Sequence, residues 1–305
     1  MKIIHSRDIP RRTPAPGPDD VSALLQTIAA SQLRAWVERI AVPRDYSGQP
    51  AQNAATAAWL ADEFAAMGYT VARQGQYNNI VAHHEGVSGP VVLVGAHYDS
   101  VAETPGADDN GSAVAALLGC AEACSRWPQP LPLVFVAFNL EERCYAGSTD
   151  FVESWLPHAP FRVECAHILE MVGMASSAPG SQRVPTGLPI DLGDVGDFLG
   201  LLADDRSSAA MEAIVQLAVD RIPDLPVSAL CVPAGAERAF PVLARSDHVP
   251  FWTRGIPALL WTDTAEFRNP HYHLATDLPD TLDYDFMRRV TQVLTAFVVS
   301  QAAAL

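Results

Sequence analysis

Residues that can bind a divalent metal follow four separate apolar runs of this 305-residue chain. The runs at 90–96, 131–138, 166–169 and 257–262 precede His97-Tyr98-Asp99, Asn139-Leu140-Glu141-Glu142, Glu170 and, after a loop, His271-Tyr272-His273. The segment between the first two runs carries Asp108-Asp109-Asn110. Because ligands of α/β proteins collect at the carboxyl ends of the strands, this pattern predicts one site assembled from distant segments.

Metal-assisted hydrolysis is the chemistry that these side chains offer. His97 and Asp99 lie two residues apart after a strand, so both project to one side, and one can bind a metal while the other orients it. Two metals about 3.5–4 Å apart need a shared ligand, and one carboxylate of the Asp108-Asp109 pair could bridge them. The sequence alone leaves open which of the two carboxylates does so.

The adjacent Glu141 and Glu142 point in different directions, so one can bind metal while its neighbour acts as a general base. Each motif alone is typical of an ordinary turn or solvated strand end, and Asp-Asp-Asn-Gly is a strong turn signal. Their joint position after apolar strands favours a functional site.

The elements that must position these residues alternate between strands and helices, which predicts an α/β protein with parallel strands. Strands are expected at 69–72, 79–82, 91–96, 131–138, 166–169 and 256–262, and helices at 19–41, 51–67, 112–127, 207–221, 247–252 and 283–304. We expect an extended tail over 1–18 and one catalytic domain over 19–305. Residues of about 173–240 are expected to form a partial lid or insert.

The composition excludes several functions. A formal net charge of −15 argues against nucleic acid, which requires clustered Lys and Arg, and against anionic membranes. No apolar stretch approaches the roughly 18 residues of a membrane span, and no secretory signal is evident, so a cytoplasmic location is expected, or a secreted one if a signal was removed. The five cysteines do not form a disulfide framework. Oligomeric state is not indicated.

Six motifs resemble, in order, those of the co-catalytic zinc aminopeptidase family, which also holds glutaminyl cyclases and glutamate carboxypeptidases. They are GAHYDS (95–100), GADDNGS (106–112), NLEE (139–142), LEMVG (169–173), RSDHVPFW (245–252) and NPHYH (269–273). The resemblance covers the chain from about Val21 onward. It implies a three-layer α/β/α fold with a central mixed, mostly parallel sheet. It also implies two zinc ions, with cobalt or manganese as possible substitutes, and hydrolysis of peptides next to a free N-terminus.

The resemblance also implies a ligand set. One zinc would be bound by His97, Asp108 and Glu170, and the other by Asp108, Glu142 and His273. Glu170 stands where the family often has Asp, so its side chain is one methylene longer. The peptide bond between Asp108 and Asp109 would be cis.

The remaining roles implied by the resemblance are catalytic. Asp99 would hold the imidazole of His97, Glu141 would be the general base, and Tyr272 would hydrogen-bond the oxyanion of the tetrahedral intermediate. Two further histidines compete as ligands. His248 is expected to support the structure, whereas spacing alone does not separate His271 from His273.

Three other functions are alternatives for a sequence with these motifs. A glutaminyl-cyclase-like acyltransferase would use one zinc, and the intact acidic loop at 106–112 argues against it. A carboxypeptidase or dipeptidase of the same fold stays open. A non-catalytic binding protein should have lost ligands or the base, and none is missing here.

Overall fold

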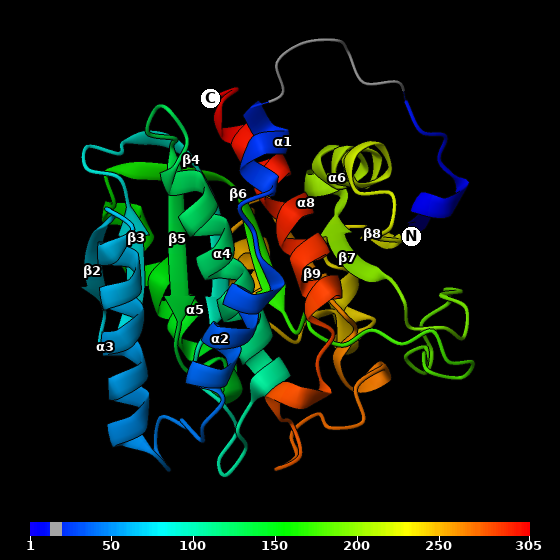
Figure 1. Cartoon of the computed structure of the whole chain (residues 1–305), viewed down its shortest axis with the longest axis horizontal. Helices are drawn as coiled ribbons and strands as arrows, with labels where there is room; N and C mark the ends of the chain where they lie inside the picture. Colours follow the sequence, from blue (N-terminus) through cyan, green and yellow to red (C-terminus); the bar gives the residue numbers. More distant parts are fainter. Residues whose placement is uncertain (13–19) are drawn as a thin grey trace.

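The computed structural model describes residues 1–12 and 20–305. Within them, nine strands form one sheet in the order β1-β8-β7-β9-β6-β4-β5-β3-β2 (Figure 1). Their bounds are β1 Lys2–His5, β2 Thr70–Gln74, β3 Asn79–His83, β4 Gly89–His97, β5 Leu133–Phe138, β6 Phe161–Glu170, β7 Leu199–Asp204, β8 Val227–Val232 and β9 Ala258–Thr262.

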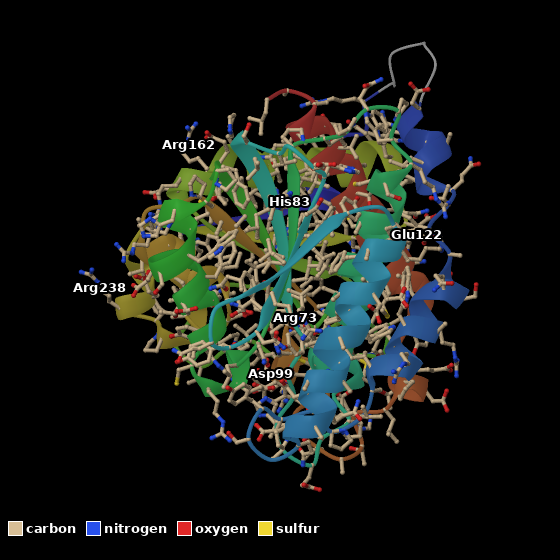
Figure 2. The ribbon with its side chains drawn as sticks, turned by 90° about the vertical axis from the view of Figure 1, so that its left-hand side faces the viewer. Arg73, His83, Asp99, Glu122, Arg162 and Arg238 are labelled. Atoms are coloured by element: carbon tan, nitrogen blue, oxygen red, sulfur yellow. The ribbon has the colours of Figure 1, made fainter. Side chains whose placement is uncertain are left out.

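The direction of the central strands determines where a site can form. Strand β4 pairs in parallel with β5 and β6, and β6 pairs in parallel with β9. Strands β7 and β8 are parallel to each other, and the other neighbouring pairs are antiparallel. The four central strands therefore end at one edge. Figure 2 shows Asp99, which follows β4, near the lower end of the molecule, whereas Arg162, at the start of β6, lies at the upper end.

Helices cover both faces of the sheet. One face packs against α1 Asp20–Leu25, α2 Ala30–Ile40, α3 Pro50–Ala66, α4 Ala113–Ser125, α6 Ser208–Arg221 and α8 Tyr284–Ala302 (Figure 1). The other face packs against the shorter α5 Ala146–Asp150, the following turn and α7 His248–Thr253. The predicted three-layer α/β/α fold with a central mixed sheet is confirmed. None of the helices among the described residues is long and apolar enough to cross a membrane.

Local sequence explains the two helices that frame the site from this layer. Helix α4 is apolar almost all round and buried throughout most of its length, because it lies between the sheet and the helices α2 and α8. Helix α8 begins where the carboxylate of Asp283 accepts a hydrogen bond from the backbone N–H of Phe286, at 2.8 Å. An Asp at this position satisfies a backbone donor that the helix itself cannot.

The predicted helix over 19–41 is in fact two helices. Helix α1 ends at Leu25 and α2 begins at Ala30, while Asp19 lies outside the described residues. The hydroxyl of Thr27 donates to the carbonyl of Leu24 at 2.7 Å, and such local bonding competes with helix continuation. The other predicted helices and strands are present, with ends shifted by a few residues.

Three strands were not predicted: β1, β7 and β8. Strand β1 pairs with β8, so this part of the predicted tail belongs to the sheet, whereas 13–18 lie outside the described residues. The predicted partial lid or insert over 173–240 contains β7, α6 and β8, so much of this segment belongs to the sheet and its helix layer. The single catalytic domain stays a prediction, and the continuous sheet favours it.

Candidate active site

Side chains from four strand ends and one loop converge at the carboxyl edge of the sheet. His97 ends β4, Glu170 ends β6, and Glu141 and Glu142 lie in a short 3-10 turn after β5. His273 follows β9 and a turn. One ligand atom each from His97, Asp109 and Glu142 lies within 4.8 Å of the others. The predicted convergence of distant segments is therefore present in the structure.

Asp109, and not Asp108, stands between the two histidines. Its Oδ1 lies 3.5 Å from Nε2 of His97, and its Oδ2 lies 3.1 Å from Nε2 of His273. The carboxylate of Asp108 instead accepts hydrogen bonds from the backbone of Gly173 and the side chain of Asn269, at 2.9 and 2.6 Å. The prediction of Asp108 as the bridging residue is thus wrong by one position. The cis peptide bond is likewise displaced, because it joins Asp109 to Asn110.

Buried hydrogen bonds hold this loop in place. The carboxylate of Asp277 accepts from the backbone N–H groups of Asp108 and Asp109, at 2.9 and 3.1 Å. The amide of Asn110 donates to the carbonyl of Leu169 and accepts from the N–H of Met171, which ties the loop to the end of β6. The direction of each Asp side chain is therefore set by contacts that lie far away in sequence.

The first half of the site combines His97 and Glu170. Nε2 of His97 lies 3.4 Å from Oε2 of Glu170, and that same oxygen accepts a 2.6 Å hydrogen bond from the hydroxyl of Ser246. On the far side of the imidazole, Nδ1 lies 3.4 Å from Oδ1 of Asp99. Because Nδ1 faces Asp99, Nε2 is the nitrogen available to a metal.

Asp99 also organises the neighbouring turn. Its two oxygens accept the backbone N–H groups of Glu141 and Glu142, at 3.2 and 3.3 Å. The turn places Oε2 of Glu142 3.5 Å from Nε2 of His273, whereas Oε2 of Glu141 lies 4.0 Å from Nε2 of His97. The two glutamates therefore face different halves of the site.

The competing histidines lie outside this cluster. Nδ1 of His271 lies 3.0 Å from the hydroxyl of Thr276, and this pair is exposed. His248 is buried, with Nε2 2.9 Å from the carbonyl of Leu243. Of the two histidines in the 269–273 motif, the structure thus brings His273 to the site.

The electrostatics of the cluster fit a bound cation. Burial, with added repulsion from nearby carboxylates, raises the pKa of Glu141 well above its usual range and that of Glu142 to about 9. Burial would raise the pKa of Asp109 too, but hydrogen bonds with His273 and His97 outweigh it and lower that pKa. For His97, burial lowers the pKa, yet the charge of Glu170 and hydrogen bonds with the flanking carboxylates raise it overall.

One buried carboxylate oxygen of the cluster, Oε1 of Glu142, lacks a hydrogen-bond partner among the described residues. Buried polar atoms are normally paired, and buried carboxylates are stable only when charge or hydrogen bonds compensate them. An unpaired carboxylate oxygen beside further carboxylates and the Nε2 atoms of His97 and His273 is a donor set that suits zinc.

A cavity of about 160 Å³ adjoins the cluster. Its polar end is formed by the carboxylates and by His273, and its walls extend across strands β7, β8 and β9. Apolar residues dominate those walls: Leu188, Ile190, Leu192, Phe198, Leu202, Leu230, Val242, Leu243, Leu260 and Phe267. The cavity can therefore accept an apolar group beside a reacting centre.

Sequence reasoning overlooked three residues that support the site. Asp277 holds the acidic loop, Ser246 contacts Glu170, and Arg245 donates to the hydroxyl of Tyr272 at 3.2 Å. Ser246 and Arg245 belong to the recognised RSDHVPFW motif, which could have pointed to them. Asp277 carries no local signal, because only the fold brings it to the loop.

Comparisons with known proteins agree with this geometry. Residues 79–298 match the profile of peptidase family M28. The uncharacterized protein YfbL of Escherichia coli is 34% identical over 253 residues, covering 77% of this chain and 76% of YfbL. The aminopeptidase YwaD of Bacillus subtilis is 28% identical over 68% of this chain, which spans only 40% of YwaD.

Two solved structures share the fold at 20% sequence identity. The LapA aminopeptidase of Legionella pneumophila has a TM-score of 0.76, with 94% of this chain and 74% of that chain covered. The glutaminyl cyclase of Porphyromonas gingivalis has a TM-score of 0.65, with 93% and 100% covered. The predicted family and fold are confirmed, and two of these four proteins, YwaD and LapA, are named aminopeptidases. The chain belongs to peptidase family M28 and is a peptidase.

Proposed function

We propose that this protein is a zinc-dependent aminopeptidase with two metal positions. His97, Asp109 and Glu170 would hold one ion, and Asp109, Glu142 and His273 would hold the other. The observation that carries the proposal is the position of Asp109, one oxygen of which faces the imidazole of His97 and the other that of His273. A carboxylate shared in this way is the element that a two-metal site requires.

The protein's own groups account for the remaining chemistry. Zinc bound at these positions would supply a Lewis acid for the substrate carbonyl and a water of lowered pKa. Glu141 borders the cavity on the side of His97, so its carboxylate can accept a proton from the attacking water and deliver it to the leaving amine. Tyr272 borders the same cavity, where its hydroxyl can donate to the oxyanion.

The substrate proposed is a peptide with a free N-terminus. The carboxylates Glu141 and Glu170 line the polar end of the cavity, where they would attract an α-ammonium group. The apolar walls would then receive the first side chain. The name of the relative YwaD, an aminopeptidase, supports this choice. A cytoplasmic location stays a prediction.

The first test is metal analysis with chelation. We expect about two zinc ions per chain, loss of activity after dialysis against chelator, and recovery on addition of zinc, cobalt or manganese. Glu141→Gln should keep its metal and lose about 10²–10⁴-fold in kcat, the contribution typical of a general base. Full activity in that variant contradicts the mechanism.

The second test separates the proposed activity from its alternatives. The enzyme is incubated with aminoacyl anilides, with the same compounds acetylated at the amine, and with a peptide beginning in Gln. Cleavage of free-amine compounds alone supports an aminopeptidase. Cleavage of blocked compounds indicates a carboxypeptidase or other peptidase, and release of ammonia without peptide cleavage indicates a cyclase.

A further inference from the structure

Arg245 and Tyr272 form a contact at the rim of the cavity that links two separate loops. A guanidinium nitrogen of Arg245 lies 3.2 Å from the phenol oxygen of Tyr272, and both residues line the cavity. The Tyr272 ring stacks on the imidazole of His273, with centroids 3.7 Å apart and planes inclined by 19°. The phenol is thus held beside the reacting centre from two directions.

The chemistry of this contact determines which way the phenol proton can point. Arginine carries only donors and stays charged, so the Tyr272 oxygen must accept in this pair. The hydroxyl proton is then free for another acceptor, and within residues 1–12 and 20–305 no protein group accepts it. The proton is therefore available to a group that enters the cavity.

Glu266 holds the arginine in position. Its carboxylate contacts the guanidinium nitrogen Nη1 of Arg245, while the other terminal nitrogen reaches Tyr272. Burial lowers the pKa of Arg245, but pairing with Glu266 outweighs it and raises that pKa, which keeps the guanidinium charged. The side chain of Arg245 is 46% exposed, so it is anchored by these two contacts and not by core packing.

We propose that Arg245 is a positioning residue that orients the Tyr272 hydroxyl as a donor to the oxyanion of the transition state. This inference rests on the proposed function, since it assumes a tetrahedral intermediate in the cavity. The guanidinium also polarises the phenol, because a charged donor at its oxygen strengthens the O–H as a donor in turn. Arg245 itself acts on the substrate only through Tyr272.

The kinetic test is a double-mutant cycle with the variants R245Q, Y272F and R245Q/Y272F. Removing an oxyanion donor costs about 10²–10³ in kcat, so Y272F should fall in that range. R245Q should lose about tenfold in kcat with KM changed less than twofold, and R245K should retain more activity than R245Q. In the Y272F background, R245Q should change kcat less than twofold. Multiplicative losses would mean that Arg245 acts independently of Tyr272 and would overturn the proposal.

A measurement without catalysis follows the contact directly. The chain contains 7 tyrosines, so 3-fluorotyrosine labelling gives a resolvable ¹⁹F spectrum in which Y272F identifies the Tyr272 resonance. R245Q should shift that resonance in metal-free and zinc-loaded protein alike. If the Tyr272 resonance is unchanged in R245Q, the proposal is contradicted even if that variant is less active.

The matched control is R254Q, which removes another exposed arginine paired with a glutamate. Nε of Arg254 lies 3.7 Å from Glu153, and both side chains are about half exposed. The R254Q variant should leave kcat and the Tyr272 resonance unchanged. Its melting temperature should equal that of R245Q. If the wild type cleaves no aminoacyl anilide, the proposed function fails, while the resonance still tests the pairing of Arg245 with Tyr272.

Discussion

Nε2 of His273 lies 3.1 Å from Oδ2 of Asp109, which joins the loop after β9 to the loop after β4. The other oxygen of Asp109 faces His97. Neither loop alone supplies the three protein ligands that a catalytic zinc position typically has. This contact therefore makes the acidic loop the centre of the site.

Asp109 and its neighbour should differ in their effect on metal binding. Asp109→Ala is expected to weaken zinc binding by more than 100-fold, because changes even behind the ligands cost 10–100-fold. Asp108→Asn should keep its zinc and lose about 1–2 kcal/mol of unfolding free energy, since Asp108 accepts two buried hydrogen bonds. Metal content after dialysis and urea unfolding measure the two effects. Zinc loss in the Asp108 variant alone would identify Asp108, and not Asp109, as the shared ligand.

Ser246 should tune the affinity of the first metal position. Its hydroxyl donates to Glu170 at 2.6 Å, so Ser246→Ala frees that carboxylate to rotate. We expect zinc affinity to fall about 10–100-fold, measured by competition with a chromophoric chelator. Ser148→Ala is the matched control, because Ser148 donates in the same way to Asp247 and not to a proposed ligand. Equal losses in both variants would contradict a specific role for Ser246.

The apolar cavity should select large apolar side chains at the substrate N-terminus. Its walls suit leucine or phenylalanine. One additional methylene in such a pocket stabilises transition-state binding by about 1–3 kcal/mol. Leucyl anilide should therefore exceed alanyl anilide in kcat/KM by about 10–200-fold or more. Val242→Phe should lower that ratio, because Val242 lines the cavity without being fully buried. Val87→Phe, at a residue outside the cavity lining, should not. A ratio near one in the wild type would show that the cavity does not receive this side chain.

Two buried histidines should make the fold less stable in acid. Burial lowers the pKa of His167 and of His248 to about 4. Nδ1 of His167 accepts from the indole of Trp261 at 3.2 Å, so the folded protein requires this imidazole neutral. The unfolded chain binds these protons near pH 6.5. Stability is therefore fully present above pH 6.5 and is lost as the pH falls toward 4.

The effect should be about 3 kcal/mol for each histidine over that interval. Urea unfolding of wild type and His167→Gln, both metal-free, between pH 7 and pH 4.5 isolates one contribution, because the other titrating groups are common to both. The difference in unfolding free energy between the two proteins should shrink as the pH falls. A constant difference would mean that the pKa of His167 is the same in the folded and the unfolded protein.

The types of side chain that gather at the site, and their place at the carboxyl ends of the strands, could be predicted from the sequence. His97 and Glu170 end apolar strands, and Glu141 and Glu142 follow another one within four residues. Strands of this kind lie side by side in parallel, so residues at their carboxyl ends must meet. The layers of the fold followed from the same alternation of strands and helices.

Neighbouring residues of the same type are distinguished by the folded chain and not by the local sequence. Asp108 and Asp109 offer identical carboxylates, and their directions depend on the backbone contacts made by Asp277 and Asn110, which the local sequence does not reveal. His271 and His273 share the same spacing rule, yet only His273 reaches Asp109. Loop side chains obey no fixed period, unlike those of strands and helices, so their orientation is set by long-range packing and hydrogen bonding.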